Sequence, residues 1–168
     1  MSQFKRKSAR FEKKKNMKIK YVDVDTNLEV RKIVLNGIEQ RGVFATKDLE
    51  KNTFVVEYAG KLLNGKEAIE IEKNYAQNND VGCFMLFFKF KEKKYCIDAT
   101  VENCSVGRLI NHSKKKTKEN IKPRIQMYDD LPRIVFFSTK KILENEELFY
   151  DYGDRSQASI ALNNWLKY

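Results

Sequence analysis

Two tyrosines separated by a single residue are the part of this chain best suited to chemistry. Tyr150 and Tyr152 flank Asp151 and are followed at once by Gly153. If the segment is extended, residues at alternate positions share a face, so both phenols point the same way. Glycine then lets the chain turn sharply after them. Tyr58, at the end of an apolar run, is a third tyrosine that can face the same channel.

A channel lined by such side chains suits the methylation of an amine. A lysine has a pKa near ~10.4 and must lose its proton before it can attack a methyl group on a sulfonium donor. Burial between aromatic walls and the charge of the sulfonium both lower that pKa. Phenol hydroxyls orient the amine, and the site mainly positions two groups and excludes water. The other interpretation is packing, since strand aromatics such as Phe84, Phe87, Phe88 and Phe136 are usually core residues.

The only histidine of the chain, His112, follows Asn111. It is either a hydrogen-bonded structural residue or part of a site where its backbone and the asparagine side chain hold polar groups of a cofactor. Trp165 is likewise either a plug of the core or a flat surface on which an adenine ring stacks. A cysteine nucleophile formed by Cys104 and His112 is not favoured, because nothing nearby supplies an oxyanion hole.

Several functional classes are excluded by motifs that the sequence lacks. It has no GxGxxG after a strand and no GxxxxGK[ST], so Rossmann-type and P-loop nucleotide sites are not expected. One histidine excludes multi-histidine metal sites, and Cys83, Cys96 and Cys104 show no CxxC spacing for zinc. We therefore expect no metal, and free thiols in a reducing compartment. No apolar run approaches the ~18 residues of a membrane span, and the basic N-terminus lacks a secretory apolar region.

The net charge of +10 is concentrated at the N-terminus. Residues 1–20 hold nine Lys or Arg against one acidic residue, a net +8, which leaves only +2 for the rest of the chain. The arm is either a solvated, partly helical segment or an electrostatic contact for a polyanion. A second basic cluster, Lys114–Lys118, directly follows the histidine segment. Non-specific DNA contact through phosphates fits this charge, whereas no base-reading motif is visible.

The apolar spacing predicts many short strands and one good internal helix. Asn64 has the N-cap position of a helix expected to run to about residue 77, with Glu67 in capping-box spacing. Its buried side is expected to comprise Ala68, Ile69 and Ile71. Strands rich in β-branched residues are expected over Lys18–Val24, Leu28–Val34, Val43–Thr46 and Phe54–Tyr58.

Two hairpins are expected in the second half of the chain. The first pairs Phe84–Lys91 with Tyr95–Asp98 through a turn at Glu92-Lys93-Lys94. The second pairs Ile121–Tyr128 with Arg133–Thr139 through a turn at Asp129-Asp130. Short strands with a single helix indicate a mostly β or α+β domain rather than a parallel α/β fold.

Taken together, five ordered segments resemble the SET-domain family of protein-lysine methyltransferases. They are Arg41–Val43, Val55–Tyr58, Tyr95–Thr100, Gly107–Ser113 and Glu147–Ser156. The resemblance is closest to the branch that monomethylates the lysine at position twenty of histone H4, since the ending Trp165-Leu166-Lys167 is similar and no zinc-binding cysteine cluster follows the tyrosines. It covers residues 28–168 as a SET catalytic domain with a short C-terminal flank, and leaves residues 1–27 as a basic arm, partly helical.

The resemblance implies a fold of small curved sheets with a C-terminal pseudo-knot that brings Asn111 and His112 beside the tyrosines. It implies Tyr152 as the main catalytic tyrosine, with Tyr58 and Tyr150 bordering the lysine amine. The implied cofactor is S-adenosylmethionine, released as S-adenosylhomocysteine, with no metal. The cofactor residues it implies are Gln40, Arg41, Phe84, Asn111, His112 and Trp165, and the substrate residues are Cys83, Phe87 and Asp154.

The resemblance also implies a substrate and a place in the cell. It indicates transfer of one methyl group to the histone H4 tail, since a tyrosine at the position of Tyr150 limits the methyl count. It implies a nuclear, chromatin-associated monomer that meets the nucleosome, with DNA contact through the basic arm and no membrane. Two alternatives stay open: a methyltransferase for a non-histone protein, and an inactive basic module that binds chromatin.

The chain departs from the family pattern at a few positions. Gln40 stands where the family usually has glycine before the Arg-Gly pair. Phe84, Leu86 and Phe87 stand where the similar branch has tyrosines, so hydroxyl groups are missing beside the expected channel.

Overall fold

The computed structural model describes residues 27–35, 37–77, 84–102, 105–113, 115 and 117–152. The expected basic arm therefore lies outside the described residues except for its last position. The expected strand Lys18–Val24 and everything after Tyr152 also lie outside them. The two described segments that matter most for function, around His112 and around Tyr150, are both included.

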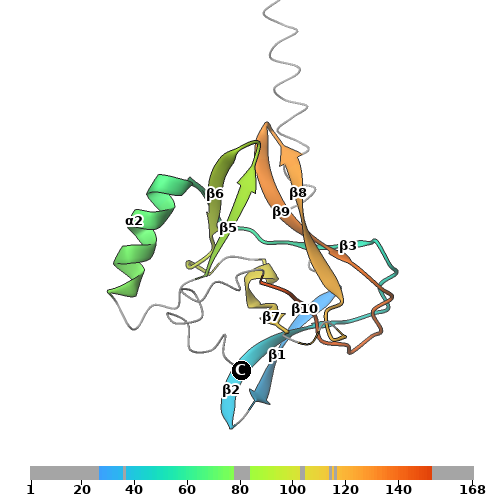
Figure 1. Cartoon of the computed structure of the whole chain (residues 1–168). Helices are drawn as coiled ribbons and strands as arrows, with labels where there is room; N and C mark the ends of the chain where they lie inside the picture. The colour runs from blue at the N-terminus through green and yellow to red at the C-terminus, as the bar shows by residue number, and fades with distance from the viewer. Residues whose placement is uncertain are drawn as a thin grey trace, which may run out of the picture.

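Small antiparallel sheets and a single α-helix make up the described part of the chain (Figure 1). One sheet pairs β1 (Leu28–Leu35) with β2 (Ile38–Ala45). A second has the order β3 (Phe54–Glu57), β9 (Leu131–Ser138), β8 (Ile121–Tyr128). A third has the order β4 (Lys61–Asn64), β6 (Lys93–Asp98), β5 (Met85–Phe90). The expectation of a mostly β fold built from small sheets is confirmed.

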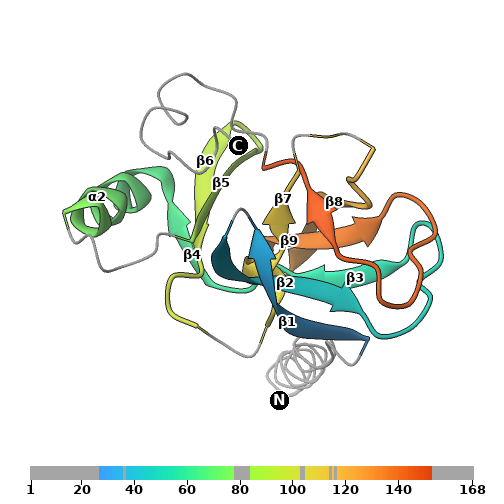
Figure 2. The ribbon, with the colours of Figure 1, turned by 90° about the horizontal axis from the view of Figure 1, so that it is seen from below.

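The short 3-10 helix η1 (Gly107–Leu109) leads into β7 (Asn111–His112). This strand pairs in parallel with β10 (Phe149–Tyr150). In two perpendicular views this pair lies at the centre, between the three antiparallel sheets (Figures 1 and 2). A strand of two residues has no periodic signal, so neither β7 nor β10 could be expected from the apolar pattern. β4 was also missed, because its four residues lead directly into the expected helix and do not alternate between apolar and polar side chains.

Both expected hairpins form, and each turns through two residues with positive φ. Asp129 and Asp130 have φ of 51° and 64°, which confirms the expected turn of the second hairpin. In the first hairpin the turn is at Lys91 and Glu92, with φ of 46° and 63°, so the expected turn at residues 92–94 is wrong. Two-residue turns with both φ positive match the twist of paired strands. Lys93 therefore belongs to β6 and pairs with Phe90.

Helix α2 (Gly65–Ala76) begins with the expected capping box. Asn64 accepts hydrogen bonds from the backbone of Lys66 and Glu67, while the Glu67 carboxylate accepts from the Asn64 backbone. Ala68 is buried and Ile71 packs beside it, but Ile69 is 48% exposed, so its expected burial is wrong. The reason is helical geometry: residues three apart share a face, and Ile69 points about 100° away from Ala68.

The main core joins the sheets beneath β7 and β10. Its buried members come from all three antiparallel sheets, from β10 and from the segments around η1, so every sheet contributes side chains to one cluster. The third sheet adds Ile97 and Ala99, with Leu86 and Phe88 packed against the cluster. Largest among its buried side chains are Phe136, Ile110, Ile121, Ile142 and Leu148. This core fixes the backbone from which the candidate site residues project.

Candidate active site

The parallel pairing of β7 and β10 brings the two most informative sequence segments together. Phe149 is paired with Asn111, and Tyr150 with His112. The backbone N–H of Ser113 donates to the Tyr150 carbonyl at 3.3 Å. The backbone N–H of Tyr152 donates to Nδ1 of His112 at 3.2 Å, across 40 residues of sequence. His112 therefore works as a structural acceptor that fixes the backbone of Tyr152.

Asn120 is a buried clamp for the segment that leads into the tyrosines, and sequence reasoning missed it. Its side chain is fully buried and donates to the Glu147 carbonyl at 2.8 Å and to Oε1 of Glu146 at 3.0 Å. Its Oδ1 accepts from the backbone N–H of Phe149 at 2.9 Å. The Asn120 side chain thus makes hydrogen bonds to this segment that the backbone of a neighbouring strand would otherwise make. A single asparagine gives no signal in the sequence for such a role.

Five aromatic rings form a continuous row beside the pair. Tyr58 meets Phe136 edge to face with ring centres 6.4 Å apart. Phe136 lies 4.6 Å from Tyr150, Tyr150 lies 4.6 Å from Tyr152, and His112 lies 5.1 Å from Tyr152. Each such contact contributes about 0.5–1.5 kcal/mol beyond apolar burial. The three candidate tyrosines therefore share one rigid aromatic wall.

Two of the three phenols of this wall, those of Tyr150 and Tyr152, stay protonated. Burial raises the pKa of Tyr150 well above the usual value of 10.0, and the neighbouring tyrosines Tyr152 and Tyr58 raise it further. Burial also raises the pKa of Tyr152. The Tyr152 hydroxyl donates to the Ile110 carbonyl at 2.8 Å, and a phenol oxygen that donates in this way is also an acceptor. Both side chains can therefore act as neutral hydrogen-bonding groups but not as bases.

The backbone at Tyr58 is fixed by the close packing of Gly107 against the end of β3. Tyr58 is 5% exposed, and its N–H donates to the Ile134 carbonyl at 2.9 Å. A Cβ added to Gly107 would lie 2.4 Å from the Glu57 carbonyl oxygen and 3.2 Å from the Tyr58 Cα. Only glycine permits η1 to pack this closely against the end of β3.

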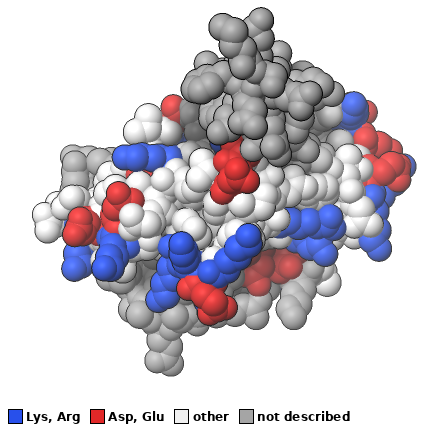
Figure 3. All heavy atoms as spheres, turned by 90° about the horizontal axis from the view of Figure 1, so that it is seen from above, with Lys and Arg blue, Asp and Glu red and all other residues white. Residues whose placement is uncertain are grey.

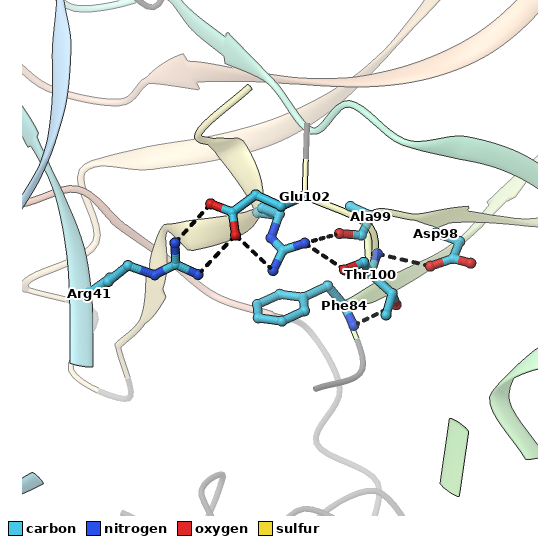
Figure 4. A network of polar contacts seen from close by, with 7 residues as sticks. Arg41, Phe84, Asp98, Ala99, Thr100 and Glu102 are labelled. Atoms are coloured by element: carbon cyan, nitrogen blue, oxygen red, sulfur yellow. Dashed lines mark hydrogen bonds and ion pairs between the residues drawn. The ribbon is translucent and has the colours of Figure 1, made fainter. Parts of the chain in front are cut away.

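A charged network, called the rim below, joins Arg41 and Glu102 beside the ring of Phe84 (Figure 4). Arg41, from β2, forms a two-pronged ion pair with Glu102, with distances of 2.8 and 3.5 Å. The pair with Arg41 lowers the pKa of the Glu102 carboxyl, with a smaller effect of Arg108. The Arg108 guanidinium lies 4.0 Å from the same carboxylate. Glu102 therefore bridges two guanidinium groups, and neither it nor Arg108 was singled out from the sequence.

Arg108 fixes the loop after β6 and the ring of Phe84. Its Nη1 donates to the carbonyls of Ala99 and Thr100 at 2.6 and 2.7 Å. Its guanidinium lies 3.9 Å from the centre of the Phe84 ring, a cation–π contact. The backbone N–H of Phe84 donates to the Thr100 hydroxyl at 3.2 Å (Figure 4). Phe84 is thus held flat at the rim, half-buried, on the same network as Arg41.

Asn111 connects the rim to the segment before the tyrosines. Its Nδ2 donates to the Arg41 carbonyl and to Oε1 of Glu147, both at 3.0 Å. Arg41, Asn111, Phe84 and the tyrosine wall therefore form one connected region of the surface.

The family described as "SET domain" matches residues 40–153 of the chain. This chain belongs to the SET-domain family. The match spans the charged rim, the aromatic wall and the β7–β10 pair, so the expected family is confirmed.

Curated SET-domain relatives are similar over most of this chain. N-lysine methyltransferase KMT5A-A of Danio rerio is 38% identical over 170 residues, covering 95% of this chain and 48% of the relative. Its Xenopus laevis counterpart KMT5A-B is 44% identical, covering 76% and 37%. Histone-lysine N-methyltransferase Set8 of Drosophila melanogaster is 43% identical, covering 84% and 20%. The chain spans half or less of the length of these relatives.

Solved SET-domain structures share the fold. CpSET8 from Cryptosporidium superimposes with a TM-score of 0.68 at 41% identity, covering 77% of this chain and 58% of that one. An autoinhibited Polycomb Repressive Complex 2 from Chaetomium thermophilum, bound to S-adenosylmethionine, has a TM-score of 0.61 at 29% identity, covering 83% and 16%.

Not every expected site residue of this SET domain joins the connected region. Gln40 is half-buried in β2. Because successive side chains of a strand point to opposite faces, the Gln40 side chain lies on the face opposite to that of Arg41. Phe87 is 43% exposed and is not part of the cluster that holds Tyr58, Tyr150 and Tyr152. Cys83, Asp154 and Trp165 lie outside the described residues.

The described residues contain neither a candidate metal site nor a candidate membrane-spanning helix. Among the described residues, no group of three or more His, Cys, Asp or Glu side chains is placed to hold a metal ion. In that part of the chain, no helix is long and apolar enough to cross a membrane. Cys96 is a buried free thiol, and the other two cysteines lie outside the described ranges.

Proposed function

We propose that this SET domain is a protein-lysine methyltransferase that transfers one methyl group from S-adenosylmethionine to the lysine at position twenty of histone H4. The observation that carries the proposal is the wall of Tyr58, Tyr150 and Tyr152, joined through β7 to the rim of Arg41 and Asn111. The relatives named as KMT5A and Set8 lysine methyltransferases support the same reaction and substrate class.

The residues of the rim fit the chemical groups of S-adenosylmethionine. That molecule carries an ammonium and a carboxylate at one end and a flat adenine at the other. The rim offers a guanidinium on Arg41, an amide on Asn111, and a flat ring on Phe84 that is fixed by a cation–π contact. We assign these three residues and His112 to cofactor binding, and Gln40 and Trp165 keep the same assignment from the family pattern. When bound, the cofactor supplies an electrophilic methyl group on a sulfonium.

The tyrosine wall prepares the lysine amine for attack. Packing the lysine stem against aromatic rings removes water from the ammonium group, which lowers its pKa and favours loss of the proton to solvent. The Tyr152 hydroxyl donates to the Ile110 carbonyl, so its oxygen can accept an N–H of the neutral amine. That contact aims the nitrogen lone pair along one direction, and such positioning is the main source of rate here. The products are methyl-lysine and S-adenosylhomocysteine.

Tyr150 is assigned as the residue that limits the reaction to one methyl group. It is 3% exposed and its ring lies 4.6 Å from both Phe136 and Tyr152, so it is held tightly on two sides. Among the described residues no hydrogen bond is made by the Tyr150 hydroxyl. It can therefore form a hydrogen bond with a water molecule or with the lysine amine. A phenol and a water beside the amine occupy the space that a second methyl group needs.

The nucleosome is the proposed partner, reached by a nuclear, chromatin-associated monomer. On the face in Figure 3, basic and acidic side chains of the described residues are interspersed rather than segregated. The excess positive charge lies in residues 1–20 of the sequence, so we assign non-specific DNA contact to that arm. Cys83, Phe87 and Asp154 are assigned to the histone tail, with Phe87 reaching it from its exposed position.

The test is mass spectrometry of recombinant nucleosomes and free histones after incubation with the protein and S-adenosylmethionine. We expect a gain of one methyl group, about 14 Da, on the H4 tail. The Tyr152→Phe variant is the matched control and should be slowed about a hundredfold while still folded. Methylation of other proteins but no histone would replace the substrate assignment. No methylation of any protein, with nucleosome binding retained, would replace the enzyme assignment with a binding module.

A further inference from the structure

The side-chain amide of Asn111 is oriented by two acceptors. Both lie 3.0 Å from its Nδ2: the backbone carbonyl of Arg41 and Oε1 of Glu147. An amide nitrogen has two N–H donors, so both are used. The carbonyl oxygen Oδ1 is then the only group of this side chain left for a ligand, and it can only accept.

Glu147 is an acceptor-only partner for the Asn111 amide. The carboxylate is half-buried, and no Lys or Arg of the described residues forms an ion pair with it. A carboxylate can only accept hydrogen bonds, so it accepts the Asn111 N–H but would repel the Asn111 oxygen if the amide turned over. Glu147 therefore favours the same amide orientation as the Arg41 carbonyl, which also only accepts, and its carboxylate is the partner that a side-chain substitution can remove.

Gly42 makes the room that this contact needs. A Cβ at Gly42 would lie 2.6 Å from Oε1 and 3.1 Å from the carboxyl carbon of Glu147. These atoms end a flexible side chain, so an alanine there would push the carboxylate aside rather than stop the chain from folding. Cε2 of Phe44 would lie 3.1 Å from the same Cβ, so that ring must shift by only a few tenths of an ångström. The glycine of the Arg-Gly pair and the glutamate before the tyrosines thus meet at Asn111.

The backbone of Glu147 is fixed independently of its carboxylate. Its carbonyl accepts from Asn120 at 2.8 Å, and the next residue, Leu148, donates to the Val43 carbonyl at 2.8 Å. Replacing the carboxylate should therefore leave the course of the chain unchanged. Its remaining role is the orientation of the Asn111 amide.

We propose that Glu147 is a positioning residue of the cofactor site: it holds the Asn111 amide so that Oδ1 faces the ligand and accepts from a positively charged or N–H group of S-adenosylmethionine. The inference rests on the proposed function, because Asn111 is assigned there to cofactor binding. It adds a residue that never touches the ligand.

The test measures the affinity of the full chain for S-adenosylhomocysteine by calorimetry, without any reaction. Glu147→Met keeps the length of the side chain and removes the acceptor, and we expect binding about tenfold weaker. Glu147→Gln keeps an acceptor oxygen and should bind within about threefold of the wild type. Glu144→Gln is the control: that nearby carboxylate is exposed and is not an acceptor of the Asn111 amide, whose two donors go to Arg41 and Glu147, so affinity should not change.

A substitution at Gly42 disturbs the same hydrogen bond between Glu147 and Asn111 without changing either residue. Gly42→Ala should weaken S-adenosylhomocysteine binding by displacing the carboxylate, and it should add little to Glu147→Met, because neighbouring changes that break one contact are not additive. In turnover assays the Michaelis constant for S-adenosylmethionine should rise more than the turnover number falls. Should Glu147→Met fail to fold, the Gly42→Ala measurement decides.

The outcomes separate this inference from the proposed function. Wild-type binding of S-adenosylhomocysteine together with unchanged binding by folded Glu147→Met or Gly42→Ala would overturn the role of Glu147. A wild type that binds no S-adenosylhomocysteine would overturn the proposed function itself. A fall in affinity that tracks a large fall in melting temperature in every variant, including Glu147→Gln, would mark Glu147 as structural and also overturn the inference.

Discussion

Tyr150 and Tyr152 stand two positions apart, yet their hydroxyls are in different situations. That of Tyr152 is tied to the Ile110 carbonyl, whereas that of Tyr150 has no hydrogen-bond partner among the described residues. The first hydroxyl is therefore part of a fixed scaffold, and the second is free to meet a water or a substrate. This difference supports separate roles for the two tyrosines, one in orienting the amine and one in limiting the methyl count.

Replacing Tyr150 with Phe should change the product rather than abolish the reaction. The variant removes one oxygen and keeps the ring against Phe136, so the space beside the amine grows by about one water molecule. We expect dimethyl-lysine on histone H4 peptide where the wild type gives monomethyl-lysine, read by mass spectrometry at long times. An unchanged product distribution would show that another residue limits methylation.

The two buried phenols also predict how stability depends on alkaline pH. Their pKa values are raised in the folded state above the usual 10.0, so as pH rises past 10 the unfolded chain loses these protons first. Folding stability is then lost with rising pH. Between pH 9 and pH 11 the loss should be smaller in the Tyr150→Phe/Tyr152→Phe double variant, by about 1.4 kcal/mol for each tyrosine removed.

Urea unfolding of both proteins at each pH measures this difference. Equal losses in the wild type and the double variant would mean that the phenols ionise in the folded protein as readily as in the unfolded chain.

At the scale of elements, β7 and β10 are too short to be stable alone. Their pairing covers two residues of each strand, and a lone two-stranded pair is marginal at best in water. Asn120 supplies what the pair lacks, since its side chain satisfies the Glu147 carbonyl and the Phe149 N–H on either side of Leu148. The position of the tyrosines therefore depends on an asparagine some 30 residues upstream of them.

Asn120→Ala should destabilise the fold strongly. The change leaves the partly buried Glu147 carbonyl and Phe149 N–H without this partner, and each unsatisfied group costs roughly 1–3 kcal/mol, so we expect a loss of about 3 kcal/mol. Urea unfolding measures it. Asn74→Ala, at an exposed position of α2, is the matched control and should leave stability within about 0.7 kcal/mol of the wild type. Similar values for both variants would show that Asn120 is not the clamp described above.

At the scale of the molecule, the three antiparallel sheets surround the central pair and bury one cluster beneath it. The charges of this domain nearly cancel, whereas the first 20 residues carry a net +8 by sequence. Catalysis and attraction to a polyanion are therefore assigned to different parts of the chain. This division predicts that they can be separated experimentally.

Deletion of residues 1–16 should lower the methylation rate on nucleosomes more than on an H4 peptide. The difference should be largest at low salt, because screening weakens contacts between lysines and phosphates as salt rises. Initial rates on both substrates over a salt series measure it. Equal losses on nucleosomes and peptide would indicate that the arm supports the fold instead of binding DNA.

Much of the architecture is determined locally by the sequence. The capping box at Asn64, the turn at Asp129-Asp130 and the paired strands around it depend on residues within a few positions of one another, where side-chain chemistry and periodicity act directly. The order of the Arg-Gly, Asn-His and Tyr-Asp-Tyr segments also suffices to identify the family, because each keeps its chemistry wherever the fold places it.

Tertiary structure alone decided which residues meet. The parallel pairing of His112 with Tyr150, the clamp of Asn120 and the contact of Glu147 with Asn111 join residues about 30 to 40 positions apart. Pairs this distant leave no periodic trace in a single sequence, since their register is set by the packing of the sheets around them. For the same reason the exposure of Phe87 could not be read from its aromatic neighbours: it follows from the face of β5 that packs on the core.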